Sequence, residues 1–314
     1  METSYQHLPV MCEQVVSLLA PVLDSPNAVM VDATIGLGGH TLAALERFTS
    51  LRVIGFDRDP QAIEATQNRL VGVGDRLEIH QTNFDQIREI LDGQTVDAIL
   101  FDLGLSSLQI DSPDRGFAYS FDAPLSMRMD DGPGLTAADI VNTYSAKELT
   151  GIFAGYGEEK HAAKIALAIL EARQSRPFTS SAQLVDVITA SIPFGRSRSG
   201  HPAKRVFQAL RMEVNDEQSA LSRTIPAALE CLKLSGRVAI LSYHSGEDRI
   251  VKRAFLKASL DQVPPHIAVV PKQYQAQFRL VTSKAIKASP EETMQNPRSK
   301  SARLRVIERI KPKP

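Results

Sequence analysis

The chain has 314 residues, 43% of them hydrophobic, which allows one large domain or two ordinary ones and excludes a wholly disordered chain. Its 36 basic and 36 acidic side chains cancel, so overall charge does not indicate a polyanionic partner, and local charge has to be considered separately. Cys12 and Cys231 form no CxxC pair, so we expect no disulfide framework and no metal site. No basic start precedes an apolar run, and no apolar stretch approaches about 20 residues, so we expect a cytoplasmic protein with no signal peptide and no membrane span.

The first hundred residues alternate between patterns typical of strands and of helices. Short apolar runs predict strands at 28–32, 52–57, 77–80 and 96–101, and the first two end in an aspartate. Helical spacing of apolar residues predicts helices at 40–48 and 60–70, the second with Pro60 in its first turn, where proline is tolerated. This alternation indicates βαβ units and therefore a parallel sheet with an α/β, Rossmann-like fold.

The alternation stops after residue 110 and returns after residue 210. Residues 111–135 are rich in Asp, Pro, Gly and Arg, and 136–192 show only helical signals, beginning with a cap at Thr136. A helix is then predicted at 215–234, ended by Ser235 and Gly236, with strands at 238–243, 278–281 and 304–307. We therefore expect one discontinuous α/β domain, residues 1–110 and 211–314, interrupted by an all-helical insert at 111–210.

A glycine-rich turn after the first strand is the first candidate for a binding site. It runs from Asp32 through Gly36, Gly38 and Gly39 to His40, and glycines let a ligand approach the backbone closely. Asp57 ends the next strand about 20 positions later, where an acid can accept hydrogen bonds from ribose hydroxyls.

Two cofactor classes share this arrangement. A dinucleotide site needs a glycine at the sixth position of the turn, where this chain has Thr41. An S-adenosylmethionine site needs an acid about three residues before G-x-G, and Asp32 satisfies that spacing. A plain strand–helix turn and a nicotinamide-dependent oxidoreductase both stay open at this point.

Two later segments extend the predicted site. Phe84 follows the third strand, where it could stack on an adenine ring or serve as an ordinary core residue. Asp102 and Gln109 flank the stretch DLGLSSLQ at the carboxyl end of the strand 96–101. Open parallel sheets bind ligands at those carboxyl ends, so we expect both residues near the cofactor.

Several long segments resemble one family throughout most of the chain. They are DATIGLGGHT at 32–41, FDRDPQAI at 56–63, DLGLSSLQID at 102–111, DRGFAYSFDAPLSMRMD at 114–130, YGEEKHAAKIALAI at 156–169, HPAKRVFQALRMEVNDE at 201–217, SYHSGEDRIVKR at 242–253 and NPRSKSARLRVIER at 296–309. The chain with these segments resembles the bacterial 16S rRNA (cytosine-N4)-methyltransferases of the RsmH (MraW) type. It departs from the commonest family pattern at Leu108, Lys204 and Gly246.

The resemblance implies a class I methyltransferase fold, S-adenosylmethionine as methyl donor and a cytidine in the decoding region of 16S rRNA as acceptor. It implies a helical insert, which we expect to recognise the substrate within the small ribosomal subunit. By motif, the implied cofactor contacts are Gly38, Gly39, His40, Asp57, Phe84, Asp102 and Gln109.

The chemistry of such a reaction leads to a hypothesis about the stretch DLGLSS. An exocyclic amine needs alignment with the methyl group and an acceptor for its hydrogen bonds. We expect Asp102 and the backbone of 103–107 to form this acceptor, with Ser106 or Ser107 holding the base; simple turn chemistry is the alternative for both serines. His244, just past the strand 238–243, is a catalytic candidate with helix capping as its alternative.

Local positive charge indicates where RNA could bind. Residues 187–212 contain no acid, and the tail from 295 carries seven basic residues against one acid, although such runs are often only solvated surface. A non-catalytic RNA-binding protein would share this charge but would not need the cofactor-site residues Asp32, Gly38, Asp57 and Asp102. The predicted RNA contacts are Arg115, Arg196, Arg198, Lys204, Arg205 and Arg211.

Overall fold

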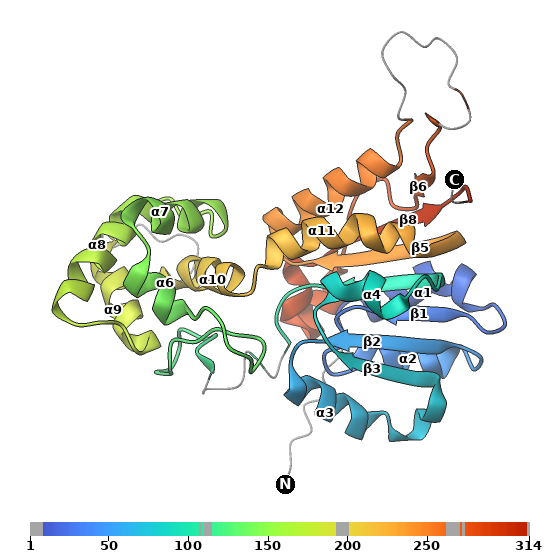
Figure 1. The fold of residues 1–314 in the computed structure, drawn as a ribbon, viewed down its shortest axis with the longest axis horizontal. Coiled ribbons are helices and arrows are strands. Elements are labelled where there is room, and N and C mark those ends of the chain that lie inside the picture. The colour runs from blue at the N-terminus through green and yellow to red at the C-terminus, as the bar shows by residue number, and fades with distance from the viewer. Residues whose placement is uncertain are drawn as a thin grey trace. The chain divides into compact units, whose positions relative to one another are not determined.

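The computed structural model describes residues 9–106, 109, 115–192, 201–261, 271 and 274–312. Its contacts divide the chain into two compact units, Met1–Gly104 with Gln218–Pro314 and Leu105–Glu217 (Figure 1). The boundaries expected from the sequence lie at 110/111 and 210/211, and the second of these falls inside one continuous helix of the Leu105–Glu217 unit. Within the described residues, no helix combines the length and apolar character that a membrane span requires.

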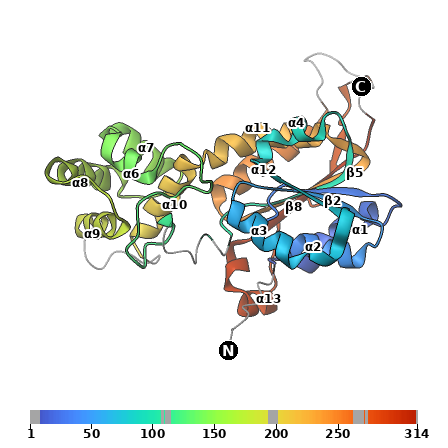
Figure 2. The ribbon, with the colours of Figure 1, turned by 60° about the horizontal axis from the view of Figure 1, so that its bottom comes forward.

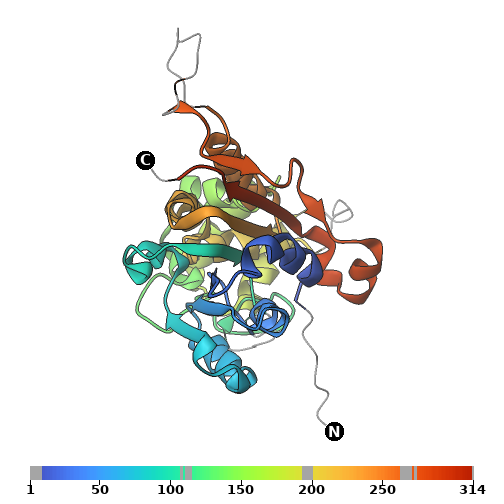
Figure 3. The same ribbon diagram turned by 90° about the vertical axis from the view of Figure 1, so that its right-hand side faces the viewer.

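The first unit is built on one eight-stranded sheet with the strand order β3-β2-β1-β4-β5-β8-β6, and β7 pairs with β8. The first five strands of this order are parallel, and β8, β6 and β7 form an antiparallel end, drawn in red in Figure 3. The parallel, Rossmann-like sheet is as predicted. The strands are β1 (Val29–Asp32), β2 (Arg52–Asp57), β3 (Leu77–Gln81), β4 (Val96–Asp102), β5 (Leu232–Ser242), β6 (Phe278–Leu280), β7 (Ile286–Lys287) and β8 (Arg303–Arg309).

Helices cover both faces of this sheet (Figure 2). On one face α4 (Ile87–Leu91), α11 (Glu217–Glu230) and α12 (Ser245–Ala258) enclose a core that includes Val31, Phe101 and Ile240. On the other, α1 (Cys12–Leu23) and α2 (Gly39–Arg47) enclose Met30, Leu100 and Ala239. Alternate residues of one strand thus enter opposite cores, which is why the central strands are apolar along their whole length.

The prediction of a helix through residue 234 is wrong at its end. Helix α11 ends at Glu230, and β5 already begins at Leu232, which pairs with Val96 of β4. The pairing then shifts by a bulge, and Ser235 adopts a left-handed φ of 67°. A bulge accommodates the Ser235–Gly236 turn inside the strand, so those residues do not mark the end of a helix.

The second unit is helical, as the sequence indicated. It contains α6 (Ala137–Thr143), α7 (Ala146–Gly155), α8 (Ala162–Ser175), α9 (Ser181–Ser191) and α10 (Ala203–Val214) around a core that includes Phe153, Ile165 and Leu210. The predicted cap at Thr136 is confirmed, because its side chain accepts from the Asp139 amide in a reciprocal capping box. Outside these helices, α3 (Pro60–Arg69) and α13 (Pro290–Gln295) complete the first unit.

Candidate active site

Asp32 holds the glycine-rich turn in place from the end of β1. Its side chain is only 2% exposed, and its carboxylate accepts from Thr41 Oγ1 at 2.6 Å and from the Thr34 amide at 3.4 Å. Burial raises the pKa of Asp32, and the Thr41 hydroxyl acts in the opposite direction. Since Thr41 belongs to the first turns of α2, Asp32 ties the strand end to the helix that follows the turn.

The glycines of this turn are required by backbone conformation and by close packing. Gly36 and Gly38 have φ values of 52° and 70°, in the left-handed region that favours glycine. A Cβ on Gly38 would lie 2.9 Å from Cγ2 of Thr66 on α3, whereas a Cβ on Gly36 would meet only Thr34 O, at 3.8 Å. The turn is thus packed tightly at Gly38 and has open space at Gly36, where a ligand can approach the backbone.

Asp57 meets this turn from the end of the neighbouring strand. Its carboxylate accepts from the Gly36 amide at 2.8 Å and from the Asp59 amide at 2.9 Å. Burial raises the pKa of Asp57 to about 6 despite these two hydrogen bonds. A carboxylate has about four acceptor sites, and the Arg58 backbone amide also donates to Asp57, so one site stays available for a hydroxyl donor.

Asp102 ends β4 beside the same turn. Its backbone amide donates to Thr34 Oγ1 at 2.7 Å, and its Oδ1 accepts from the Tyr243 hydroxyl at 2.6 Å. Its Oδ2 lies 3.5 Å from Nδ1 of His40, a side chain that is 6% exposed. The other ring nitrogen of His40 lies 2.9 Å from the Val10 carbonyl oxygen, which can only accept, so His40 Nε2 carries a hydrogen.

The structure therefore brings the predicted residues Asp32, Gly36, Gly38, Gly39, His40, Asp57 and Asp102 to the carboxyl edge of the parallel strands. Tyr243 was not recognised as part of this group from the sequence, although it directly follows β5, the strand beside β4. Burial and the Asp102 carboxylate both raise the pKa of Tyr243, so its phenol stays a hydrogen-bond donor at ordinary pH. The available signal was a hydroxyl residue, Tyr243, at the end of the predicted strand 238–243.

His244 has the contacts of a helix cap. Its Nδ1 accepts from the Glu247 amide at 3.3 Å, and its Nε2 lies 3.0 Å from Glu247 Oε1. Glu247 in turn accepts from the Tyr243 amide at 2.8 Å. Gly246 fits this arrangement, because a Cβ there would lie 3.2 Å from the His244 ring and 2.5 Å from Gln218 Nε2. The structure thus gives His244 the capping role that was its alternative, and a catalytic role stays a prediction.

Phe84 and its neighbour lie at the end of β3. The Phe84 ring packs edge-on against Phe101, with 5.7 Å between ring centroids, at the rim of the core. Asn83 Oδ1 is buried and has no hydrogen-bond partner among the described residues. A buried acceptor without a partner is costly unless a ligand donor satisfies it. Asn83 at this sheet edge therefore fits a cofactor that carries an amino group.

Ser106 and Gln109 belong to the second unit and bond to each other. The Ser106 amide donates to Gln109 Oε1 at 3.2 Å, and the Gln109 amide donates to Ser106 Oγ at 3.3 Å. This reciprocal pattern is the capping arrangement of a helix start, so Ser106 has the turn chemistry considered as its alternative. Ser107 and Leu108 lie outside the described residues. Roles of Ser106 and Gln109 toward substrate or cofactor stay predictions.

The predicted RNA contacts differ in the hydrogen bonds and ion pairs that their side chains make within the protein. Arg211 binds Glu217 through two hydrogen bonds of 2.7 and 2.8 Å, and its side chain is 13% exposed. Arg115 donates to the Arg128 carbonyl at 3.0 Å, and Arg205 donates to the Glu158 carbonyl at 3.3 Å. Lys204 is exposed, while Arg196 and Arg198 lie outside the described residues. Arg211 has the environment of a structural ion pair.

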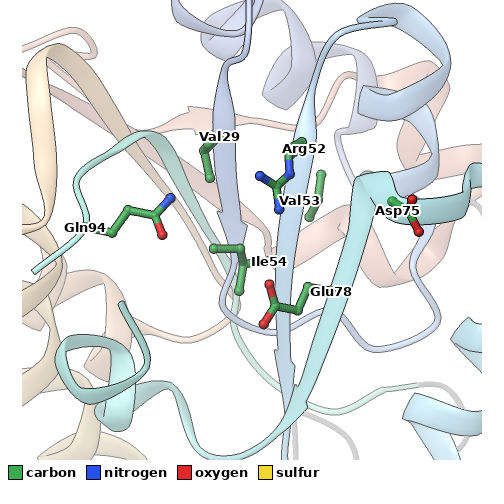
Figure 4. Close-up of a pocket in the computed structure, with 7 residues that line it drawn as sticks. All are labelled: Val29, Arg52, Val53, Ile54, Asp75, Glu78 and Gln94. Atoms are coloured by element: carbon green, nitrogen blue, oxygen red, sulfur yellow. The ribbon is translucent and has the colours of Figure 1, made fainter. Parts of the chain in front are cut away.

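A separate small pocket lies at the opposite edge of the sheet. Figure 4 shows its lining side chains, which come from the amino ends of β1 and β2 and from segments beside them. They are Val29, Arg52, Val53, Ile54, Asp75, Glu78 and Gln94. None belongs to the candidate site. Within the described part of the chain, no group of three or more His, Cys, Asp or Glu side chains could hold a metal ion.

The family model and the sequence relatives point to one family. A family model described as the MraW methylase family matches residues 4–310. A Nocardioides protein named ribosomal RNA small subunit methyltransferase H is 52% identical over 307 residues, which cover 96% of each chain. The protein of that name from Thermobifida fusca is 50% identical over 309 residues, 97% of this chain and 94% of its own. A Streptococcus mutans structure in complex with SAH is 15% identical, with 95% and 96% coverage and a TM-score of 0.44.

Proposed function

The chain belongs to the MraW methylase family, and from this membership we propose that it methylates N4 of a specific cytidine in the decoding (P-site) region of 16S rRNA. At the coarser level the chain is a methyltransferase of ribosomal RNA that uses S-adenosylmethionine. Its fold is that of a class I methyltransferase, a Rossmann-like and mostly parallel sheet. Membership in a methylase family favours methyl transfer over the nicotinamide chemistry that the glycine turn alone left open.

Residues at the carboxyl edge of the sheet fit this cofactor. The open backbone at Gly36 and the left-handed Gly38 allow close approach, and Asp57 has an acceptor site for a ribose hydroxyl. Asn83 Oδ1 has no hydrogen-bond donor among the described residues and suits the amino group of adenine. When bound there, S-adenosylmethionine supplies a methyl group on a sulfonium centre.

Asp102 is the group best placed to serve the reacting amine. The lone pair of a cytosine N4 is delocalised into the ring, so the amine needs an acceptor that binds its hydrogens as it becomes cationic. S-adenosylmethionine would supply the methyl group to N4, and the proton that N4 loses would pass to Asp102. We assign the Asp102 carboxylate, which the Tyr243 hydroxyl holds through Oδ1, as the acceptor of the N4 hydrogen bond.

The single observation that carries this assignment is the environment of the Asp102 carboxylate. It stands at the end of β4 beside the glycine turn, held on one oxygen by Tyr243 and approached on the other by His40. The methylated N4 cation is strongly acidic, so a carboxylate of ordinary strength is a sufficient proton acceptor. The proposal thus requires the geometry of Asp102 and no unusual basicity.

Two measurements test the proposed function. Mass spectrometry of 16S rRNA from cells that lack this chain should show one cytidine without its N4-methyl group, and the wild-type chain should restore it. Asp102→Ala should fail to restore it, whereas Asp75→Asn, an exposed acid at the opposite edge of the sheet, should succeed. A full set of modified cytidines in cells without the chain would refute the proposal, and near-normal methylation by Asp102→Ala would refute the role of Asp102.

A further inference from the structure

Helix α12 carries a stripe of exposed side chains that the site described above does not use. Arg249, Lys252, Arg253 and Lys257 are exposed, and their spacings of three and four place them on one helix face. Leu256 lies on the same face, and Leu260 follows two residues after the end of the helix, with 45% and 52% of their surfaces exposed. Arg249 to Lys257 extends over about 12 Å at 1.5 Å per residue.

The acids of this helix lie on its other side. The carboxylates of Glu247 and Asp248 are only 3% and 8% exposed. Asp248 binds Arg305 Nε at 2.7 Å and Arg303 Nη1 at 2.9 Å from β8, and Glu247 accepts from the amide of Tyr243. The helix therefore separates its charges, with carboxylates directed to the sheet and cations to solvent.

The stripe begins next to the candidate acceptor. Helix α12 starts at Ser245, two residues after Tyr243, whose hydroxyl binds Asp102. A nucleotide whose amine reaches Asp102 has neighbours in its own strand, and each neighbour carries a phosphate. Four cations on one short face, the first of them four residues after the start of α12, suit a polyanionic strand that leads away from that nucleotide.

We propose that the stripe Arg249, Lys252, Arg253, Leu256, Lys257 and Leu260 is an RNA-binding surface, with the cations on phosphates and the leucines against sugars or base faces. The inference rests on the proposed function for its choice of RNA over other polyanions. An anionic membrane is a different partner that a basic, partly apolar helix can bind, and the experiment separates the two.

The experiment uses the full chain with Lys252→Ala and Arg253→Ala combined, and a charge-matched control with Arg47→Ala and Arg52→Ala. Arg47 ends α2 and Arg52 begins β2, so both lie at the opposite edge of the sheet. The probe is labelled single-stranded poly(U), which contains no cytidine, so binding is measured independently of methylation. Small ribosomal subunits from cells lacking the chain serve as a second probe.

The α12 variant should bind poly(U) about tenfold more weakly at low salt, and its slope of log affinity against log salt should be shallower by about 1.4, the value for two lost phosphate contacts. The control variant should keep the wild-type affinity and slope, and both variants should unfold at the wild-type temperature. Unchanged affinity and slope in the α12 variant would overturn the proposal, as would an equal loss in the control.

A third outcome concerns membranes. Unchanged RNA binding together with lost binding to phosphatidylserine vesicles would identify the stripe as a lipid surface and overturn the proposal. If poly(U) binding weakens as expected but no cytidine in 16S rRNA depends on the chain, the RNA surface stands and the proposed methylation position fails. The two proposals are thus separately refutable.

Discussion

Tyr243→Phe isolates the contact on which the proposed chemistry depends. The change removes one hydroxyl, which lies 2.6 Å from Asp102 Oδ1, and keeps the ring that packs near Gly104. A hydrogen bond to a charged group contributes about 1.5–3 kcal/mol. If that bond holds the carboxylate in position as N4 becomes cationic, its loss should lower kcat by about 10- to 100-fold, since a factor of ten corresponds to about 1.4 kcal/mol.

The assay is single-turnover transfer of a labelled methyl group to small subunits from cells that lack the chain. The dissociation constant of S-adenosylmethionine, measured by calorimetry, should stay near the wild-type value, so the loss should appear in the rate and not in cofactor binding. The acid limb of the rate profile should move to higher pH, because a carboxylate that loses a hydrogen-bond donor is less easily ionised. A merely structural role of Tyr243 would not move this limb.

Tyr144→Phe is the matched control, because its hydroxyl also donates to a carboxylate, that of Glu213, at 2.9 Å within the helical unit. It should leave both the rate and the pH profile unchanged. Wild-type kcat and an unshifted acid limb in Tyr243→Phe would show that Asp102 does not need this hydroxyl, and the positioning argument would be abandoned.

Three further outcomes follow from the site and the helical unit. Burial raises the pKa of Asp57 to about 6 in the free protein, and ribose hydroxyls favour the ionised form of its carboxyl. Cofactor binding should therefore weaken below pH 6 and release protons near pH 6. Calorimetry in buffers of different ionisation enthalpy would contradict this if it detected no proton release. Gly38→Ala should lower the free energy of unfolding, measured in urea, by about 1–3 kcal/mol, because Gly38 has a positive φ and its added Cβ would meet Thr66. Gly72→Ala should leave the free energy of unfolding unchanged, because the space around Gly72 is open. Arg211→Ala should lower the unfolding temperature, because the substitution leaves the partly buried Glu217 without its ion-pair partner. Lys204→Ala should leave the unfolding temperature unchanged. Equal unfolding temperatures for the two variants would show that the pair of Arg211 and Glu217 does not stabilise the fold.

The local features of the methyltransferase unit were predictable from the amino-acid sequence. The alternation of apolar strands and amphipathic helices predicted the parallel sheet. The spacing of hydrophobic residues along a segment shows which of its faces can be buried, and this spacing distinguishes strands from helices. The positions of Asp32, Asp57 and Asp102 followed from strand ends, since parallel strands present their carboxyl ends at one edge. The glycines at positions 36 and 38 could also be recognised in the sequence as parts of a tight turn. A left-handed backbone favours glycine at the residue that adopts it, whatever the rest of the fold.

Contacts between side chains that are distant in the sequence depend on the tertiary structure. Tyr243 and Asp102 are 141 positions apart, and the pairing of β4 with β5 brings them together. Asp248 binds Arg303 and Arg305 of β8, which are 55 and 57 positions away in the sequence. The cations of α12 are exposed on the outer face of the helix. These pairings depend on strand register and on which side chains are excluded from water, and both are set by the whole sheet and its helices. A local pattern could therefore mark Tyr243 as a residue at a strand end but could not show that Asp102 is its partner.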